Sequence, residues 1–423
     1  MKIREDEMSE ILSWAERAWN GELAETFVSP TTTSVGLVEL LPRTAFVAAF
    51  ANTMVLDTSD GLVLIDTSSM FHAHAVHTAI RGWSKQPLHT AVYTHGHVDH
   101  VFGLMPFEAE ARPTADRVRV IAHRACRDRF DRYRLTRGYN GIINARQFGF
   151  PVPFFPDNFR YPDELLDGDR ELSVGGMQIL LHHDRGETDD HLWAYVPEAK
   201  TLYTGDLFIW ASPNCGNPQK VQRYPRDWAQ ALRKMAALDA EILLPGHGPP
   251  ICGHGRVRQA LDETASLLET LVEQTLALLN QGAPLDEILH SVHAPAELLA
   301  RPYLRASYDD PQFIVRNLYR LYAGWWDGNP AQLKPAREVE LAAEICDLAG
   351  GVDVLRQRAL SRLAEGKLAL AAHLIEQALR TSPADAAVRK AYQQIYTARA
   401  EAETSLMARG IFRAAVRKVE SGT

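Results

Sequence analysis

The sequence predicts a layered α/β domain followed by an α-helical region. Short strand-like runs alternate with helical segments from about residue 33 to residue 250, and such alternation places helices on the faces of a sheet. From about residue 256 the strand signal disappears, and apolar residues recur at helical spacing. The 423 residues are enough for two or three domains at roughly 150 residues each.

The composition is that of an ordinary globular protein. Apolar residues make up 46%, charged residues make up 23%, and the formal net charge is −8, which argues against disorder and against a protein that follows nucleic-acid backbones. There is no run of about 18 apolar residues that could span a membrane, and no signal-peptide segment follows the charged start. We therefore expect a cytoplasmic protein with no membrane or nucleic-acid partner, and free thiols at its four scattered cysteines.

The elements of the α/β region follow from local patterns. Residues 7–19 predict a leading helix, and a loop ending at Pro30 follows it. Strand-like runs at 46–56 and 62–66 flank Ser59-Asp60-Gly61, a turn signal typical of hairpins. Later strands are predicted at 90–94, 118–122, 177–182, 193–196, 201–204 and 241–244, and helices at 70–83, 124–136 and 225–237.

The region after residue 256 contains clear helical segments. Residues 259–279 carry leucines close to helical periodicity. Residues 354–365 and 368–380 predict a helix pair with Gly366 at its corner, and a further helix begins near Ala384. One such pair resembles a tetratricopeptide unit, although one unit is not an array. We expect this region to serve packing or assembly.

A histidine-rich turn is the strongest functional signal. The run Thr94-His95-Gly96-His97-Val98-Asp99-His100 directly follows a predicted strand. Imidazole nitrogens and carboxylate oxygens are ligands that zinc accepts. His95 and His97 could face one ion while Asp99 and His100 face another. The competing interpretation is a surface loop that is rich in histidine by chance.

Three later motifs, each just after a predicted strand, could complete such a site. Alone, each is more typical of a turn, but in this order after a His-x-His-x-Asp-His run they are far more specific. They are Arg185-Gly186-Glu187-Thr188-Asp189-Asp190-His191, Thr204-Gly205-Asp206 and Leu244-Pro245-Gly246-His247-Gly248.

With these motifs, residues 33–255 resemble the metallo-β-lactamase superfamily, whose fold is an αββα sandwich. The resemblance implies a centre in which one pair of residues holds the first metal and a second pair holds the second. It also implies a carboxylate that bridges the metals and a histidine that completes the second site. His95 and His97 would hold the first metal, and Asp99 and His100 would hold the second. Asp206 would be the bridging carboxylate, and His247 would complete the second site.

One position departs from the common superfamily pattern. Most members carry Gly-His-Thr where this chain has Gly186-Glu187-Thr188. A glutamate there resembles the alkylsulfatase branch, which implies that Glu187 is the third ligand of the first metal. The rival candidates for this role are His182, His183 and His191.

The helical region resembles the same branch. Its segment Gly324-Trp325-Trp326-Asp327-Gly328-Asn329-Pro330 is similar to a segment of the alkylsulfatase dimerisation domain, which implies a homodimer. The predicted division is a lead-in at 1–32, a catalytic domain at 33–255 and a dimerisation domain at 256–423. Alkylsulfatases usually add a sterol-carrier-like domain, for which we expect no room here, and they usually carry glutamate at the position of Asp206.

The chemistry implied is hydrolysis by a metal-held hydroxide, with Asp99 and Asp206 in catalytic roles. Two Zn²⁺ ions per chain would lower the pKa of water toward about 7, although a carboxylate at position 187 also suits manganese or iron. The favoured substrate is an alkyl or aryl sulfate ester. The alternative is the same centre acting on a lactone, carboxylic ester, phosphodiester or β-lactam, and a third hypothesis is a non-catalytic metal-binding or assembly protein.

Glutamate in place of histidine makes the centre one unit less positive, so an anionic substrate should need cationic help. Arg223 and Arg226 follow Asp206 in the chain and could supply it. The predicted substrate contacts lie in two loop-rich segments, one between the first and second motifs and one after Asp206. They are Tyr139, Asn144, Arg146 and Asn217.

Overall fold

The computed structural model describes residues 10–24, 35–110 and 117–421, and these residues contain two β-sheets. Within these residues the first sheet has its strands in the order β1 to β7, antiparallel as far as β4 and parallel from β4 to β7. The strands are β1 (Gly36–Leu41), β2 (Thr44–Ala48), β3 (Thr53–Thr58), β4 (Gly61–Ile65), β5 (Leu88–Val92), β6 (Arg119–His123) and β7 (Glu164–Leu166).

The second sheet has the order β13-β12-β11-β10-β9-β8. Its pairs are antiparallel except for β11 and β12, which run parallel. Its strands are β8 (Arg170–Val174), β9 (Met177–His183), β10 (Leu192–Val196), β11 (Thr201–Ile209), β12 (Ile242–His247) and β13 (Ile251–Cys252).

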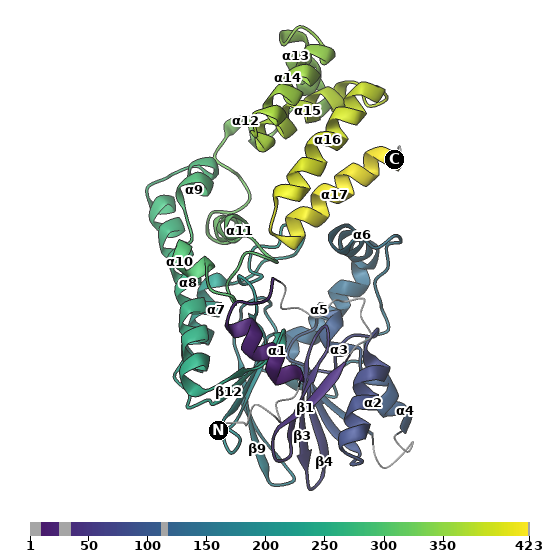
Figure 1. Ribbon diagram of the computed structural model, residues 1–423, viewed down its shortest axis with the longest axis vertical. Helices are drawn as coiled ribbons and strands as arrows, with labels where there is room; N and C mark the ends of the chain where they lie inside the picture. Colours follow the sequence, from purple (N-terminus) through teal and green to yellow (C-terminus); the bar gives the residue numbers. More distant parts are fainter. Residues whose placement is uncertain (1–9, 25–34, 111–116, 422–423) are drawn as a thin grey trace. The chain divides into compact units, whose positions relative to one another are not determined.

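An apolar core lies between the sheets. Phe46 and Leu56 of the first sheet and Leu181, Tyr203 and Leu244 of the second belong to one buried cluster. Figure 1 shows α2 and α4 beside the first sheet and α7 and α8 beside the second. This helix–sheet–sheet–helix layering confirms the predicted αββα sandwich. Its helices are α1 (Glu10–Trp19), α2 (Ala73–Trp83), α3 (Val98–Val101), α4 (Met105–Glu110), α5 (Arg124–Leu135), α7 (Pro225–Ala236) and α8 (His254–Asn280).

The first elements differ in detail from the prediction. The run at 46–56 is two strands, β2 and β3, because the Asn52 side chain organises a turn between them. Its Oδ1 accepts a hydrogen bond from Ala49 N at 3.2 Å, and asparagine favours turns through such local bonds. The leading helix is described from Glu10, while its predicted start at Glu7 and the loop end at Pro30 lie outside the described residues.

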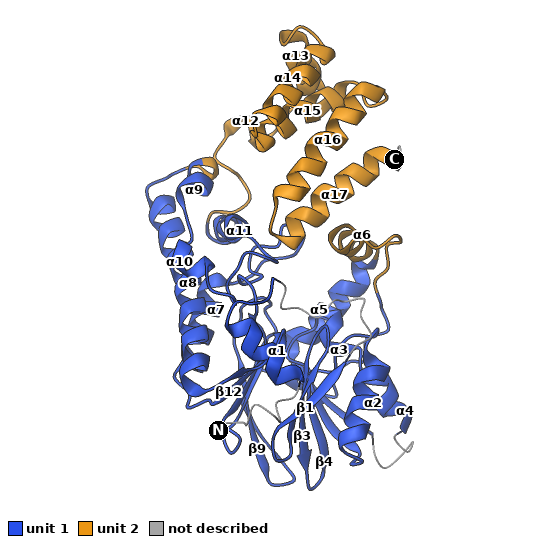
Figure 2. Ribbon diagram, in the orientation of Figure 1, with its two compact units in different colours: residues 1–137, 156–283, 287–322 blue, residues 138–155, 284–286, 323–423 orange. Residues whose placement is uncertain are grey.

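The chain forms two compact units, coloured separately in Figure 2. The first comprises residues 1–137, 156–283 and 287–322, and it contains both sheets; the second comprises residues 138–155, 284–286 and 323–423. No described helix combines the length and apolar character needed to cross a membrane. The helices between α8 and the second unit are α9 (Leu285–Ser291), α10 (Ala296–Leu299) and α11 (Pro311–Ala323).

The second unit is helical in its described residues, as predicted for the end of the chain. Its core packs α13 to α16 around residues such as Ile375 and Ile395, and Gly366 takes a positive φ of 74° at the corner of the predicted pair. Its helices are α6 (Arg137–Phe148, which begins at the unit border), α12 (Pro330–Leu333), α13 (Glu338–Leu348), α14 (Val352–Ala364), α15 (Leu368–Thr381), α16 (Ala386–Ala402) and α17 (Leu406–Ser421).

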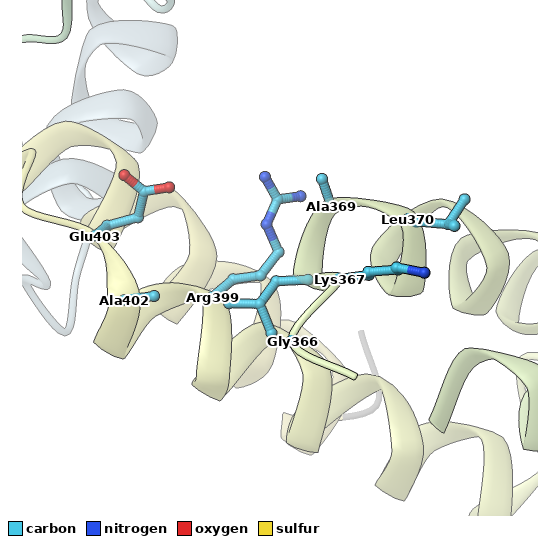
Figure 3. Close-up of a pocket in the computed structure, with 8 residues that line it drawn as sticks. Gly366, Lys367, Ala369, Leu370, Arg399, Ala402 and Glu403 are labelled. Atoms are coloured by element: carbon cyan, nitrogen blue, oxygen red, sulfur yellow. The ribbon is translucent and has the colours of Figure 1, made fainter. Parts of the chain in front are cut away.

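A cavity of about 500 Å³ opens within this second unit (Figure 3). It lies between the α14–α15 corner and the end of α16, and Lys367, Arg399 and Glu403 are its charged lining residues. None of the predicted metal ligands or substrate contacts lines it.

Candidate metal centre

Seven histidine and carboxylate side chains meet at one end of the two sheets. They follow or end strands β5, β9 and β12, lie within β11, or begin the short helix α3. Parallel neighbours such as β11 and β12 end at the same edge, which brings their terminal residues together. The ligand atoms form two groups, and within each group they lie no more than 4.8 Å apart: His95, His97, Glu187 and Asp206 in the first, and Asp99, His100 and His247 in the second.

The first group is buried and tightly spaced. Glu187 Oε2 lies 3.1 Å from His97 Nδ1 and 3.5 Å from His95 Nε2. His95 Nε2 and His97 Nδ1 are 2.8 Å apart. The 95–97 turn and the segment after β9 therefore direct these three atoms at a common point.

Asp206 belongs to the first group and also approaches the second. Its Oδ1 is 3.3 Å from His100 Nε2, and its Oδ2 is 3.4 Å from His247 Nε2 and 3.8 Å from His95 Nε2. Gly246 leaves the room for this carboxylate, because a Cβ at that position would lie 2.0 Å from Asp206 Oδ1. Asp99 Oδ2 approaches His247 Nε2 at 3.4 Å.

Several atoms at the meeting point are buried without a hydrogen-bond partner. They include His100 Nε2, Glu187 Oε2 and Asp206 Oδ1. A buried polar atom without a partner is unfavourable by about 1–3 kcal/mol, and buried charges are usually paired or coordinate a metal. Nitrogen and carboxylate donors directed at a common point therefore fit a pair of divalent cations.

Asp66, which follows β4, holds His100 in place. The carboxylate accepts hydrogen bonds from His100 Nδ1 at 2.7 Å, Thr94 N at 2.7 Å and Tyr203 Oη at 3.2 Å. Because Nδ1 donates to Asp66, Nε2 is the electron-pair donor whenever the His100 ring is neutral. Burial acts to lower the pKa of His100, but the Asp206 and Asp66 carboxylates outweigh it and raise that pKa.

His247 is oriented by the backbone. Its Nδ1 lies 2.5 Å from Phe50 O, so Nε2 faces the carboxylates. Asn52 fixes the turn that carries His247, since its Nδ2 donates to Pro245 O at 2.9 Å and Gly248 O at 2.8 Å. The same asparagine that divides β2 from β3 thus positions a histidine of the other sheet.

Two charged residues support the 95–97 turn. Gly96 N donates to Asp190 Oδ2 at 2.8 Å, and Asp190 Oδ1 accepts from Arg129 Nε at 3.0 Å. Arg129 also bonds Asp189. Both Asp190 and Arg129 are buried, so this ion pair is shielded from solvent and fixes the turn.

Glu187 divides its two oxygens between different partners. Oε1 accepts hydrogen bonds from Arg223 Nη1 at 2.6 Å and from Asn214 Nδ2 at 2.5 Å, while Oε2 faces the histidines. Burial acts to raise the pKa of Glu187, but Arg223 and His97 outweigh it and bring the pKa to about 2. The carboxylate is therefore ionised throughout the physiological range.

The three rival histidines lie outside both ligand groups. His182 bonds Asp169 at 2.8 Å and stacks on Trp193, and His183 stacks on His123 with ring centroids 3.6 Å apart. His191 stacks on His95 at 4.7 Å, and its Nε2 accepts the Asp206 backbone N–H at 3.2 Å. Glu187, rather than any of the three, completes the first group.

The predicted substrate contacts fall in different units. Tyr139, Asn144 and Arg146 lie on α6 in the second unit, in a segment read as loop-like that is in fact helical. Asn217 belongs to the first unit, where it is buried and its Oδ1 accepts from Gln219 N at 3.0 Å. Their contact with a substrate stays a prediction.

The residues that support the ligands were not predicted from the sequence. Asp66 and Asn52 went unnoticed, although an aspartate that ends an apolar strand is a usable signal. Asp190 lay in a quoted motif but received no role. Arg223 was expected to face an anionic substrate, whereas its guanidinium bonds Glu187.

Asp309 anchors the loop after β11 and makes stability depend on pH. Its buried carboxyl accepts from Gly216 N at 2.5 Å and Asp310 N at 2.8 Å, and burial raises its pKa to about 7, against about 3.9 when unfolded. Folding therefore takes up a proton between these values, and the free energy of unfolding falls by roughly 1.4 kcal/mol per pH unit as pH rises to about 7. We expect Asp309→Asn to flatten this slope in chemical unfolding from pH 5 to 7.5; equal slopes would contradict it.

The sandwich and the two groups of candidate metal ligands are typical of the metallo-β-lactamase type. Residues 47–247 match the family model of the metallo-β-lactamase superfamily, and residues 284–422 match that of alkyl sulfatase dimerisation. The chain thus joins a metallo-β-lactamase superfamily domain to an alkylsulfatase dimerisation domain, as the resemblance implied.

Several relatives that match about four fifths of this chain are named as alkylsulfatases. The chain is 26% identical over 362 residues to a linear primary-alkylsulfatase of a Pseudomonas species, covering 79% of this chain and 67% of that protein. It is 23% identical over 361 residues to the alkyl/aryl-sulfatase BDS1 of Saccharomyces cerevisiae, covering 79% and 55%. The chain therefore spans between about half and two thirds of the length of these relatives.

A solved structure shows the same fold. The stereoselective inverting sec-alkylsulfatase Pisa1 from Pseudomonas superposes with a TM-score of 0.83 at 24% identity, covering 92% of this chain and 66% of that chain.

Proposed function

We propose that this protein is a dinuclear metal-dependent hydrolase that cleaves alkyl or aryl sulfate esters. The observation that carries the proposal is the position of Asp206, whose two oxygens approach histidine atoms of both groups. The alkylsulfatase relatives support the choice of a sulfate ester.

His95, His97 and Glu187 would hold one cation and Asp99, His100 and His247 the other, with Asp206 shared. We propose zinc, because four of the seven donors are histidines. Divalent ions bound there supply Lewis acidity and a water of lowered pKa for ester hydrolysis. The protein itself supplies the orientation of each donor atom, through Asp66, the Phe50 carbonyl and Arg223.

A cationic side chain beside the centre favours an anionic substrate. Lys220 lies in the loop after Asp206 and is half-buried. Burial and Arg223 lower its pKa to about 8, against the opposing charges of Asp99 and Glu187. Lys220 is therefore still mainly charged at pH 7, and we propose that it helps to bind the sulfate group.

A substrate panel tests the activity. We expect metal-loaded protein to hydrolyse nitrophenyl sulfate or a medium-chain alkyl sulfate faster than nitrophenyl phosphate, nitrophenyl acetate or a lactone, and a chelator to remove the activity. If the acetate, phosphate or lactone is turned over faster, that compound class is the substrate and the proposed sulfate ester is wrong. No turnover of any of them by protein carrying two ions would contradict a hydrolase.

We also propose a homodimer formed through the second unit. The match to alkyl sulfatase dimerisation supports it, as do the exposed leucines of α13, since Leu341 is 51% exposed and Leu348 is 86% exposed. These leucines are seven residues apart and share a helix face. Light scattering at micromolar concentration should give the mass of two chains. We expect Leu341→Asp/Leu348→Asp to give the mass of one chain and Leu370→Asp, a partly exposed leucine of α15, to leave the dimer intact.

A further inference from the structure

We propose that Arg223 is a positioning residue that makes Glu187 a charge-compensated metal ligand, so that the centre keeps the charge it would have with histidine at position 187. The inference rests on the proposed metal centre, but it does not depend on which ester is cleaved. It gives Arg223 a different role from a substrate contact.

The contacts fix which oxygen of Glu187 faces the centre. Arg223 Nη1 and Asn214 Nδ2 both donate to Oε1, and Arg223 Nη1 also bonds the Asn214 backbone oxygen. Oε2 is buried without a hydrogen-bond partner and faces His97 and His95 at 3.1 and 3.5 Å. The carboxylate is thus held by one oxygen and presents the other as a single donor atom.

Bonds to the main chain fix the segment that carries Arg223. Arg223 stands just before α7, and the next residue, Tyr224, donates its N–H to Gly186 O at 2.9 Å. Asn317 Nδ2 donates to Arg223 O at 3.0 Å. The segment that carries the arginine is therefore tied directly to the residue preceding Glu187, which fixes the distance between the two side chains.

The formal charges explain why this pair matters. Two divalent cations with the carboxylates of Asp99, Glu187 and Asp206 leave one positive charge, whereas a neutral histidine at position 187 would leave two. The Arg223 guanidinium restores the missing charge from within the protein. Its side chain is 3% exposed and that of Glu187 is 1% exposed, so solvent screens this charge little.

The same burial makes the arginine unfavourable without its partner. Removing one member of a buried ion pair leaves an uncompensated charge, which is more harmful than replacing both members by neutral groups. A histidine at position 187 beside an intact Arg223 should therefore be a poor ligand. Removal of the arginine should rescue that ligand, and this reversal is specific to the proposed role.

A double-mutant cycle measures the effect on metal binding. The variants are Arg223→Met, Glu187→His and the double substitution, and the readouts are zinc stoichiometry, zinc affinity by chelator competition, and the absorption spectrum of the cobalt-loaded protein. We expect Arg223→Met and Glu187→His each to lower the affinity for the first ion by about 10–100-fold, which is the usual range for residues that orient a ligand. The double variant should bind that ion at least tenfold more tightly than Glu187→His.

Matched controls separate this role from a structural one. Arg258→Met removes an arginine of α8 whose side chain is 65% exposed, and it should leave zinc affinity unchanged. Arg223→Lys keeps the charge and should retain more zinc affinity than Arg223→Met. The lysine variant remains informative if the methionine variant folds poorly. Wild-type affinity in Arg223→Met, or a double variant no better than Glu187→His, would overturn the inference. If the unaltered protein binds no zinc, it is the proposed metal centre that fails.

Discussion

Replacing Asp206 by asparagine is expected to abolish hydrolysis and to release at least one of the two metal ions. Asp206 is the only residue whose oxygens approach both ligand groups among the described residues, with Oδ1 3.3 Å from His100 Nε2 and Oδ2 3.8 Å from His95 Nε2. The amide keeps the shape of the side chain but removes the negative charge that Asp206 would share with two bound cations, which would then repel each other more strongly at low effective dielectric. Loss of Lewis acidity should raise the activation free energy by several kcal/mol, which lowers kcat by about a thousandfold or more.

Metal content and turnover are measured together on the same preparations. Asp167→Asn is the matched control, because Asp167 is a 70% exposed aspartate paired with Arg124 on the surface, and it should keep two ions and normal kcat. Circular dichroism checks that Asp206→Asn is folded. An Asp206→Asn protein with two tightly bound ions and ordinary turnover would contradict a bridging role and, with it, the proposed centre.

The layered fold could be predicted because it depends on local periodicity. Alternating apolar residues mark the strands, and the sheets bury their apolar faces against each other. The errors arose where tertiary contacts decide. The 137–148 segment reads as loop because it contains Gly138, Asn140 and Gly141, yet it is helical; a Cβ on Gly141 would lie 3.3 Å from Phe154 N. That glycine permits close packing within the second unit instead of ending the helix.

The candidate ligands could be proposed for a related reason, since each lies in a short motif after a strand. Their supporting residues could not, because each is a single residue whose partner is distant in the chain. Arg223 and Glu187 are 36 residues apart, and Asn52 and Pro245 are 193 apart. Only the folded chain shows that Arg223 acts on a ligand, and this pairing removes the charge deficit that the sequence suggested for the centre.

Replacing Asp66 by asparagine should release the second metal ion while leaving the first bound. Asp66 Oδ2 accepts a hydrogen bond from His100 Nδ1 at 2.7 Å, and Oδ1 accepts one from Thr94 N at 2.7 Å. The asparagine Oδ1 would still accept the hydrogen bond from Thr94 N, so its NH2 group would face His100 Nδ1. His100 Nδ1 would then have to accept a hydrogen bond instead of donating one. The proton moves to Nε2, so the atom that faces Asp206 can no longer donate an electron pair to a metal.

We expect metal content to fall from two ions toward one. The affinity for the second ion should fall by about 10–100-fold, and kcat should fall by a larger factor. Nitrogen NMR of labelled histidine reports the tautomer of His100 directly. Asp169→Asn is the matched control, since Asp169 also accepts from a histidine Nδ1, that of His182, at 2.8 Å, but its side chain is 63% exposed. Because His182 lies outside both ligand groups, that change should alter one histidine tautomer and leave both ions in place. Equal metal loss in the two variants would show that orientation of His100 is not what Asp66 provides.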